Sequence, residues 1–340
     1  MTPEQRFLFD VDGMIVVPDA LTPEQCVEVN SVMDARSAQG LEAGGSTNRV
    51  EQQLLPAEGE PFPSASSARD NPLHFAPVFR ALLDNPRITP ILEEIIGSGG
   101  LASSGYHHDQ AEAETLPTFR IDHINLNHIV ANTGGRLHNS GDGSSHAGGA
   151  QFFHQQDGFI HSGLLVVAYE FVDTTVNCGG FGCIPGTHKA RSALPDQWQD
   201  LSASAGPPNL RRVPAAAGSA IIFSECLTHV TLPWTALTPR RVGFYKYSPH
   251  GVAYSGNYLN APEFEQYPDM TARMLALLEP PNARYPGRPR DYEYIPAALS
   301  SHHLPSSIYH LCDYYVHSLT QIFRQSALNL LFEYGCTMTL

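Results

Sequence analysis

The alternation of apolar and polar residues predicts a β-rich middle between two helical ends. Residues 119–130 (FRIDHINLNHIV) alternate with a period of two, which is typical of a half-buried strand. Apolar runs at 159–172, 217–224 and 241–247 predict further strands, and residues 7–18 predict a short strand containing an Asp-Gly turn. Strands do not alternate with helices and no GxGxxG motif is present, so a dinucleotide-binding α/β fold is disfavoured.

Helix signals flank this middle region. Thr22 and Gln25 have the spacing of a capping box, with a proline between them, and predict a helix that runs to about Ala38. Residues 77–97 predict two short helices that are interrupted at Asn85-Pro86. We therefore expect a mainly β fold with flanking helices, of the jelly-roll or double-stranded β-helix type.

The C-terminal segment has a different pattern. Its apolar residues recur at steps of three and four, as on one face of a helix. These residues are Leu304, Ile308, Leu311, Tyr315, Leu319, Ile322 and Phe323. We predict a main domain over residues 1–285 and a helical extension over 286–340 that packs on it, and a homodimer contact through this extension stays open.

Composition narrows the classes of function. The 340 residues are 42% hydrophobic and carry a net charge of −14, with no basic cluster for nucleic acid or an anionic membrane surface. No signal peptide pattern and no apolar run of about 18 residues is present, so we expect a cytoplasmic protein. The six cysteines are scattered without a CxxC pair, which favours reduced, buried thiols.

Two segments combine a histidine with an arginine at a regular spacing. His229 follows an apolar strand in AIIFSECLTHVTLPW, and Arg240 begins the next strand eleven positions later, in RRVGFYKY. An iron(II) oxygenase needs imidazole ligands, usually a carboxylate, and open positions for cosubstrate and O2. The far carboxylate of a keto acid cosubstrate needs a cationic fork, which arginine provides through two parallel hydrogen bonds.

The motifs GLLVVAYEFVD, GGFGCIPGTHK, AIIFSECLTHVTLPW and RRVGFYKYSP resemble the phytanoyl-CoA dioxygenase family of iron(II)- and 2-oxoglutarate-dependent oxygenases. The resemblance covers roughly residues 7–285. It implies that His229 is the distal iron ligand and that Arg240 anchors 2-oxoglutarate. It further implies that Thr231 helps to hold the cosubstrate and that Tyr169 lines its pocket, whereas His188 belongs to a structural PGTHK turn.

The family's first ligand pair, His-x-Asp, is missing from this chain. His138 in RLHNS resembles one branch of the family and lies 91 residues before His229, so we favour it as the other ligand. The alternative is His154 with Asp157, which has one residue too many between the histidine and the acid.

With His138 as a ligand, the position of the acid falls on Ser140, and serine is a poor iron(II) ligand. Asp142 could take its place, because Gly141 and Gly143 allow the loop to reach inward. Otherwise water or chloride fills the site, or iron binding is lost.

The resemblance implies an enzyme that uses Fe(II), 2-oxoglutarate and O2 to oxidise a C–H bond of a small molecule, most simply by hydroxylation, with release of succinate and CO2. A halogenase or desaturase on the same scaffold is an alternative, because Ser140 leaves the iron site open. A non-catalytic binding protein with a degenerate site is the other alternative. Neither the sequence of the loops at 39–76 nor that at 132–158 identifies the substrate.

Overall fold

A computed structural model describes residues 1–38, 71–97, 117–131, 134–139, 151–156, 158–190, 192–199, 201, 206–255, 259 and 261–283. All of them belong to one structural unit, Met1–Tyr292. The predicted C-terminal extension at 286–340 and the dimer contact assigned to it lie outside these residues. No helix in the described part of the chain is long and apolar enough to cross a membrane.

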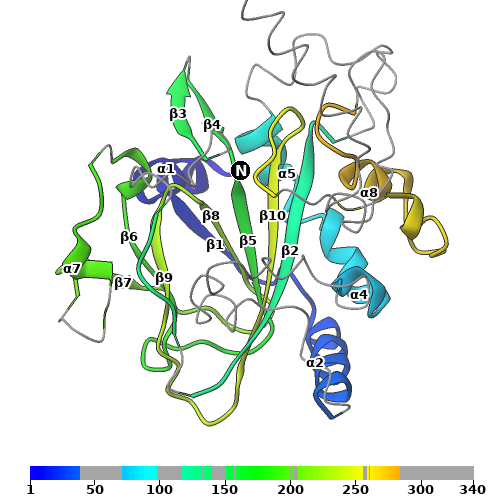
Figure 1. Cartoon of the computed structure of the whole chain (residues 1–340), viewed down its shortest axis with the longest axis horizontal. Helices are drawn as coiled ribbons and strands as arrows, with labels where there is room; N and C mark the ends of the chain where they lie inside the picture. The colour runs from blue at the N-terminus through cyan, green and yellow to red at the C-terminus, as the bar shows by residue number, and fades with distance from the viewer. Residues whose placement is uncertain are drawn as a thin grey trace, which may run out of the picture. The chain divides into compact units, whose positions relative to one another are not determined.

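The described strands form antiparallel sheets, and the expected mainly β fold with flanking helices is confirmed (Figure 1). The larger sheet has the order β1-β8-β5-β10-β2, the smaller has the order β7-β6-β9, and β3 pairs with β4 in a separate hairpin. Their bounds are β1 Met14–Val17, β2 Phe119–Ile129, β3 Phe153–Gln156, β4 Phe159–Ser162, β5 Leu165–Glu170, β6 Gly180–Ile184, β7 Arg211–Arg212, β8 Ala220–Ser224, β9 Thr228–Leu232 and β10 Arg240–Pro249.

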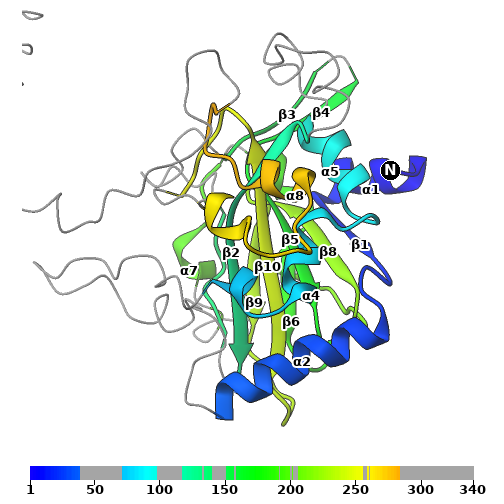
Figure 2. The same ribbon diagram turned by 90° about the vertical axis from the view of Figure 1, so that its right-hand side faces the viewer.

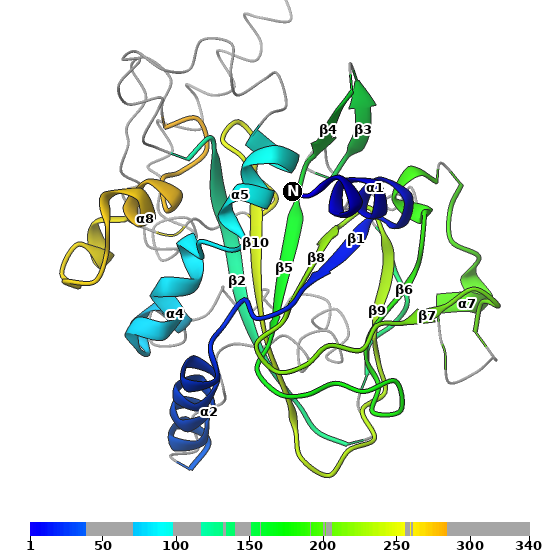
Figure 3. The same ribbon diagram turned by 180° about the vertical axis from the view of Figure 1, so that it is seen from behind.

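Helices α2, α4, α5 and α8 cover one face of the larger sheet, whereas α7 lies beside the smaller sheet, as Figures 2 and 3 show from two sides. The α-helices are α1 Pro3–Asp12, α2 Pro23–Ala38, α4 Pro77–Ala81, α5 Thr89–Leu92, α7 Asp196–Gln199 and α8 Ala272–Leu277. Short 3-10 turns lie at Pro72–His74, Leu82–Asp84, Thr187–Lys189 and Ala261–Phe264, and a π-helical turn, η4, lies at Glu93–Gly97. The smaller sheet lies on the other side of the larger one (Figure 3).

Strand alternation separates two apolar layers. In β5, Leu165, Val167 and Tyr169 belong to the core between the larger sheet and the helices, whereas Val166 and Ala168 belong to the core between the two sheets. Because successive side chains point to opposite faces of a strand, Glu170 follows Val166 and Ala168 on the face between the two sheets. The same phase holds in β10, where Val242 faces the smaller sheet and Tyr245 faces the helices.

The first predicted strand is half wrong, because residues 7–12 belong to helix α1. Thr2 and Gln5 cap this helix reciprocally, and Gly13 ends it with a left-handed φ of 79°. Phe7 is 67% exposed, so an apolar residue there does not mark a buried strand. Only the residues after Gly13 form β1.

Most other predicted elements are confirmed. Thr22 and Gln25 form the expected capping box at the start of α2, which ends at Ala38. The run at 159–172 is two strands, because the chain leaves the β3–β4 hairpin at Gly163 before β5 begins. In the described residues the cysteines are unpaired, at positions Cys26, Cys178, Cys183 and Cys226.

Candidate active site between the two sheets

His229 is placed on the inner surface of the smaller sheet by β9. The strand pairs with β6 at Cys183, and the imidazole packs 4.8 Å from the ring centroid of Phe223 and 6.2 Å from that of Phe181. Its Nδ1 donates to the carbonyl of Leu227 at 2.7 Å. This contact places the proton on Nδ1 and leaves the Nε2 lone pair available to a metal. Burial, together with His138, lowers the pKa of His229 to about 3, so the ring is neutral at neutral pH.

His138 lies directly beside His229. The two residues exchange both backbone hydrogen bonds, at 3.1 and 2.9 Å, and their ring centroids are 4.3 Å apart. The His138 side chain repeats the arrangement of its neighbour, since its Nδ1 donates to the carbonyl of Arg136 at 2.8 Å. Cross-strand partners share one face of a sheet. The structure therefore brings together two imidazoles, each with Nε2 left as the metal-binding atom.

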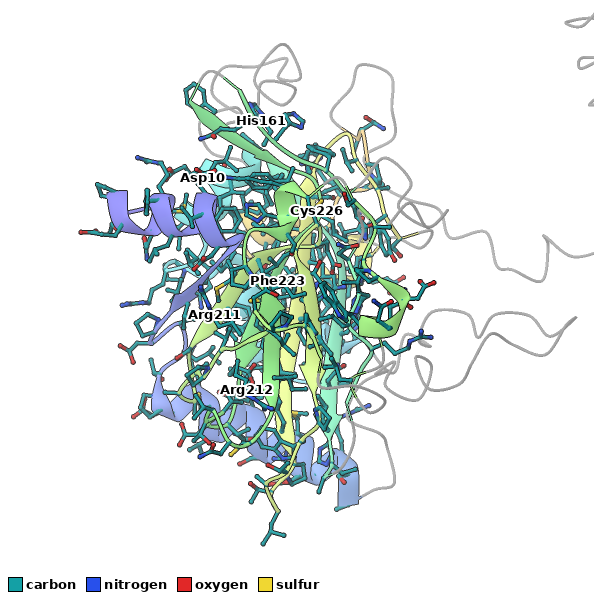
Figure 4. All side chains as sticks on the ribbon, turned by 90° about the vertical axis from the view of Figure 1, so that its left-hand side faces the viewer. Asp10, His161, Arg211, Arg212, Phe223 and Cys226 are labelled. Carbon is teal, nitrogen blue, oxygen red and sulfur yellow. The ribbon has the colours of Figure 1, made fainter. Side chains whose placement is uncertain are left out.

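Glu225 is a charged neighbour of this pair that sequence reasoning did not select. It lies in the turn between β8 and β9 and directly precedes Cys226 in the chain. Figure 4 labels Cys226 of this turn and Phe223 of β8. The Glu225 side chain is 6% exposed, and its Oε2 is 3.9 Å from Nε2 of His229. Its Oε1 accepts a hydrogen bond of 2.6 Å from Nζ of Lys246.

The charge on Glu225 is stabilised although the residue is buried. Burial raises its pKa, but the Lys246 ammonium and the two histidines outweigh this effect and bring the pKa down to about 2. The carboxylate is therefore ionised at neutral pH. In the sequence, Glu225 is recognisable as the one acid in the segment AIIFSECLTH, four residues before His229.

Arg240 begins β10 and points between the sheets, where it meets a second acid that sequence reasoning missed. Its Nε donates to Glu170 Oε2 at 3.0 Å and its Nη2 donates to Glu170 Oε1, and both side chains are fully buried. The neighbouring Arg241 points to the opposite face and donates to Asn30 and Asp34 of α2. The two arginines therefore lie on opposite faces of β10, as strand alternation requires.

One nitrogen of the buried Arg240 guanidinium is left without a hydrogen-bond partner in the described part of the chain. Nη1 of Arg240 has no hydrogen-bond partner among the described residues, and neither does Oδ1 of Asn127. Asn127 of β2 lies across from Val242 of β10, on the face that carries Arg240. Unpaired buried polar atoms are costly, so these two atoms fit a site that receives a polar ligand. The free Nη1 edge can take a carboxylate although Glu170 holds the other edge.

The two other residues assigned to the cosubstrate lie in different environments. Thr231 follows His229 by two positions in β9 and shares its inner face, opposite Phe181 of β6. Tyr169 lies on the other side of the larger sheet, where its hydroxyl donates to the carbonyl of Leu82 at 3.1 Å. The expected contact between Tyr169 and a cosubstrate does not fit this position, because strand alternation turns Glu170 inward in its place.

The remaining candidates do not join the histidine pair. His154 is exposed on β3, where its ring stacks 5.2 Å from that of His161. His188 is buried in the PGTHK turn with Nε2 3.1 Å from the carbonyl oxygen of Asp10, which supports a structural role. Ser140, Asp142 and Asp157 lie outside the described residues.

Within the described ranges, no group of three or more His, Cys, Asp or Glu side chains is already arranged to hold a metal ion. The two imidazoles nevertheless suit iron(II), because both have their Nδ1 proton held by a carbonyl and both present Nε2 on one face. His138 and His229 are thus the residues that would hold the metal.

One known protein family and several solved structures are similar to this chain. The family profile described as phytanoyl-CoA dioxygenase (PhyH) matches residues 9–242. No curated protein sequence matches the chain.

Among solved structures, HygX from Streptomyces hygroscopicus with nickel and 2-oxoglutarate bound is similar, with a TM-score of 0.53 and 16% identity. The match covers 73% of this chain and 87% of HygX. HygX structures with nickel, 2-oxoglutarate and hygromycin B (17% identity; 73% and 88% covered) and with iron (16% identity; 73% and 87% covered) both match with TM-scores of 0.52. At these identities the likeness shows a shared fold.

Proposed function

Because the chain belongs to the phytanoyl-CoA dioxygenase family of iron(II)- and 2-oxoglutarate-dependent enzymes, we propose that it hydroxylates a C–H bond of a small molecule. The observation that carries this proposal is the pair of imidazoles, His138 and His229, which lie side by side on one face of the smaller sheet. Buried Arg240, with its unpaired Nη1, supplies the cation for the far carboxylate of the cosubstrate.

Different residues of the site bind the metal and the cosubstrate. His138 and His229 hold iron(II) through Nε2, and their Nδ1 hydrogen bonds fix the ring orientations. Arg240 receives one carboxylate of 2-oxoglutarate through Nη1, and Thr231 lies on the inner face of β9, the strand that carries His229. The bound iron supplies O2 chemistry coupled to decarboxylation of 2-oxoglutarate, with succinate and CO2 as products. Phe181 and Phe223 exclude water from the side of His229.

The substrate class remains a small molecule in this proposal. HygX has been crystallised with hygromycin B, which supports a pocket for a small organic compound on this fold. The surroundings of the site do not select a particular compound. Halogenation or desaturation on the same scaffold differs from hydroxylation by what occupies the coordination position that the family's acid takes.

One observation favours a second candidate, a binding protein without turnover. Glu170 already accepts hydrogen bonds from two nitrogens of Arg240 and neutralises its charge, so Arg240 does not need a cosubstrate carboxylate as its counter-ion. Such a protein would retain the fold but would not convert 2-oxoglutarate.

An anaerobic titration with iron(II) and 2-oxoglutarate separates these candidates. We expect a visible charge-transfer band on addition of both components, and succinate formation after admission of O2. The titration is then repeated with chloride, which would alter the band if halide enters the metal site. Iron binding without the band or succinate would support the non-catalytic candidate, and absence of iron binding would refute the oxygenase.

A further inference from the structure

Glu225 has the position of a metal ligand relative to His229. Two atoms bound to one ion by bonds of about 2.1 Å lie roughly 3 to 4 Å apart, depending on the angle between the bonds. The separation of 3.9 Å between Glu225 Oε2 and His229 Nε2 falls in this span. The two atoms can therefore share one ion without a change in the backbone.

The second oxygen of Glu225 is held in the way that supports a ligand. Lys246 of β10 donates to Oε1 at 2.6 Å, so Oε2 remains the oxygen on the side of His229. Ligating carboxylates are usually hydrogen-bonded through the oxygen that does not bind the metal. The ion pair thus orients the carboxylate and does not need to break for a metal to bind.

The charge of the site also requires an acid. Two neutral imidazoles leave the full charge of a divalent ion uncompensated in an interior bounded by Phe181 and Phe223. The position two residues after His138 is Ser140, which carries no charge. Glu225 is 6% exposed on its side chain and its Oε2 lies 3.9 Å from Nε2 of His229, where a carboxylate would compensate part of that charge.

We propose that Glu225 is the carboxylate ligand of the metal and replaces the acid that the family pattern places at residue 140. The inference rests on the proposed function, because it concerns the metal held by His138 and His229. Among the described residues no three such side chains are already arranged to hold a metal ion, so this ligand set requires the exposed His138 ring or the Glu225 carboxylate to turn towards the metal. The resulting ligand set is two histidines and one glutamate, with the acid four residues before the second histidine.

The test is an anaerobic titration of the full chain with Co²⁺, without 2-oxoglutarate, followed by the visible Co²⁺ absorption bands. Loss of an outer hydrogen-bond partner typically weakens a metal site by roughly 10- to 100-fold. Glu225→Gln should weaken Co²⁺ binding by more than this and change the absorption bands, because the ligand itself is lost. The double variant Ser140→Asp/Glu225→Gln should recover affinity, because it returns a carboxylate to the site.

Lys246→Met is the matched control, since it breaks the same ion pair but leaves the carboxylate. It should weaken binding no more than an outer partner does and should keep the parent absorption bands. Equal effects of Glu225→Gln and Lys246→Met would overturn the inference and assign Glu225 a structural role, as would Co²⁺ binding by Glu225→Gln as tight as in the parent. If Glu225→Gln does not fold, the comparison is made with Glu225→Asp, which keeps the charge but shortens the side chain. This variant should weaken Co²⁺ binding more than Lys246→Met does, and equal effects of Glu225→Asp and Lys246→Met would contradict a ligand role. Failure of the parent to bind Co²⁺ would refute the proposed metal site itself.

Discussion

Glu170 and Arg240 form a two-point ion pair between the sheets, and neither side chain has exposed surface. The pair joins the inner faces of β5 and β10, where Glu170 lies across from Val242. It uses Nε and Nη2 of the guanidinium and leaves Nη1 without a partner among the described residues. The arginine that we assign to the cosubstrate is thus oriented by an acid of the protein itself.

Replacing Glu170 should make the protein depend on its cosubstrate for stability. Glu170→Ala leaves a buried positive charge unpaired, which typically costs about 3–5 kcal/mol in the free energy of unfolding. A carboxylate of 2-oxoglutarate can fill the vacated edge of Arg240, so 2-oxoglutarate with Mn²⁺ should raise the melting temperature of the variant more than that of the parent. Thermal unfolding measures this difference. 2-Oxobutyrate, which lacks the far carboxylate, is the control ligand and should give no such gain; equal protection of both proteins by 2-oxoglutarate would argue against the assignment of Arg240.

Arg240 and Arg241 should differ in their effect on cosubstrate binding. Arg240→Lys removes a forked donor and should raise the dissociation constant of 2-oxoglutarate by roughly 10- to 100-fold, as expected for loss of a charge-assisted hydrogen bond of about 1.5–3 kcal/mol. Arg241→Lys is the matched control, because Arg241 points to α2 and contacts Asn30 and Asp34. The charge-transfer band in an anaerobic titration reports both constants. A larger effect of Arg241→Lys would mean that the inner face of β10 has been assigned incorrectly.

The histidine pair should be essential for metal binding. His138→Ala and His229→Ala each remove an Nε2 donor from a site with few ligands, so we expect Fe²⁺ or Co²⁺ binding to be lost or weakened by more than about 100-fold. His154→Ala is the control, since His154 is exposed on β3 and its ring stacks on His161. Isothermal titration calorimetry compares the three variants. Retained binding in His138→Ala together with lost binding in His154→Ala would favour the alternative ligand pair of His154 and Asp157.

His188 should make the protein less stable in mild acid. Burial lowers the pKa of His188 to about 4 in the folded protein, whereas an unfolded histidine titrates near pH 6.5. Between these values the unfolded chain binds more protons, so the free energy of unfolding falls as the pH drops from about 6.5 towards 4. The contribution of this residue is on the order of 3 kcal/mol.

Urea unfolding at pH 7.5, 6 and 4.5 measures this dependence. His188→Gln cannot titrate and retains a donor for the carbonyl of Asp10, so its stability should change less with pH than that of the parent. The difference between the two proteins isolates His188 from the other histidines. Parallel pH profiles would show that His188 is not protonated on unfolding in this range.

Local sequence determined much of this protein. Thr22 and Gln25 predicted the start of α2, and the periodicity of residues 119–130 predicted β2, because capping and alternation depend only on near neighbours. The spacing of His229 and Arg240 also predicted two interior side chains on successive strands. Helix α1 was not predicted, although its capping residues Thr2 and Gly13 are local signals. Its exposed apolar residues gave the apolar run that is typical of a strand.

Tertiary structure decided which residues share the site. Strand alternation predicts that Tyr169 and Glu170 face opposite sides of the sheet. Only the packing of the folded chain shows that Tyr169 faces the helices and that Glu170 faces Arg240. Likewise, no sequence spacing placed Glu225 next to His229 and Lys246, since this contact depends on a turn and on a distant strand meeting between two sheets. Contacts across the core depend on the phase and register of several strands at once, and that information is present only in the folded chain.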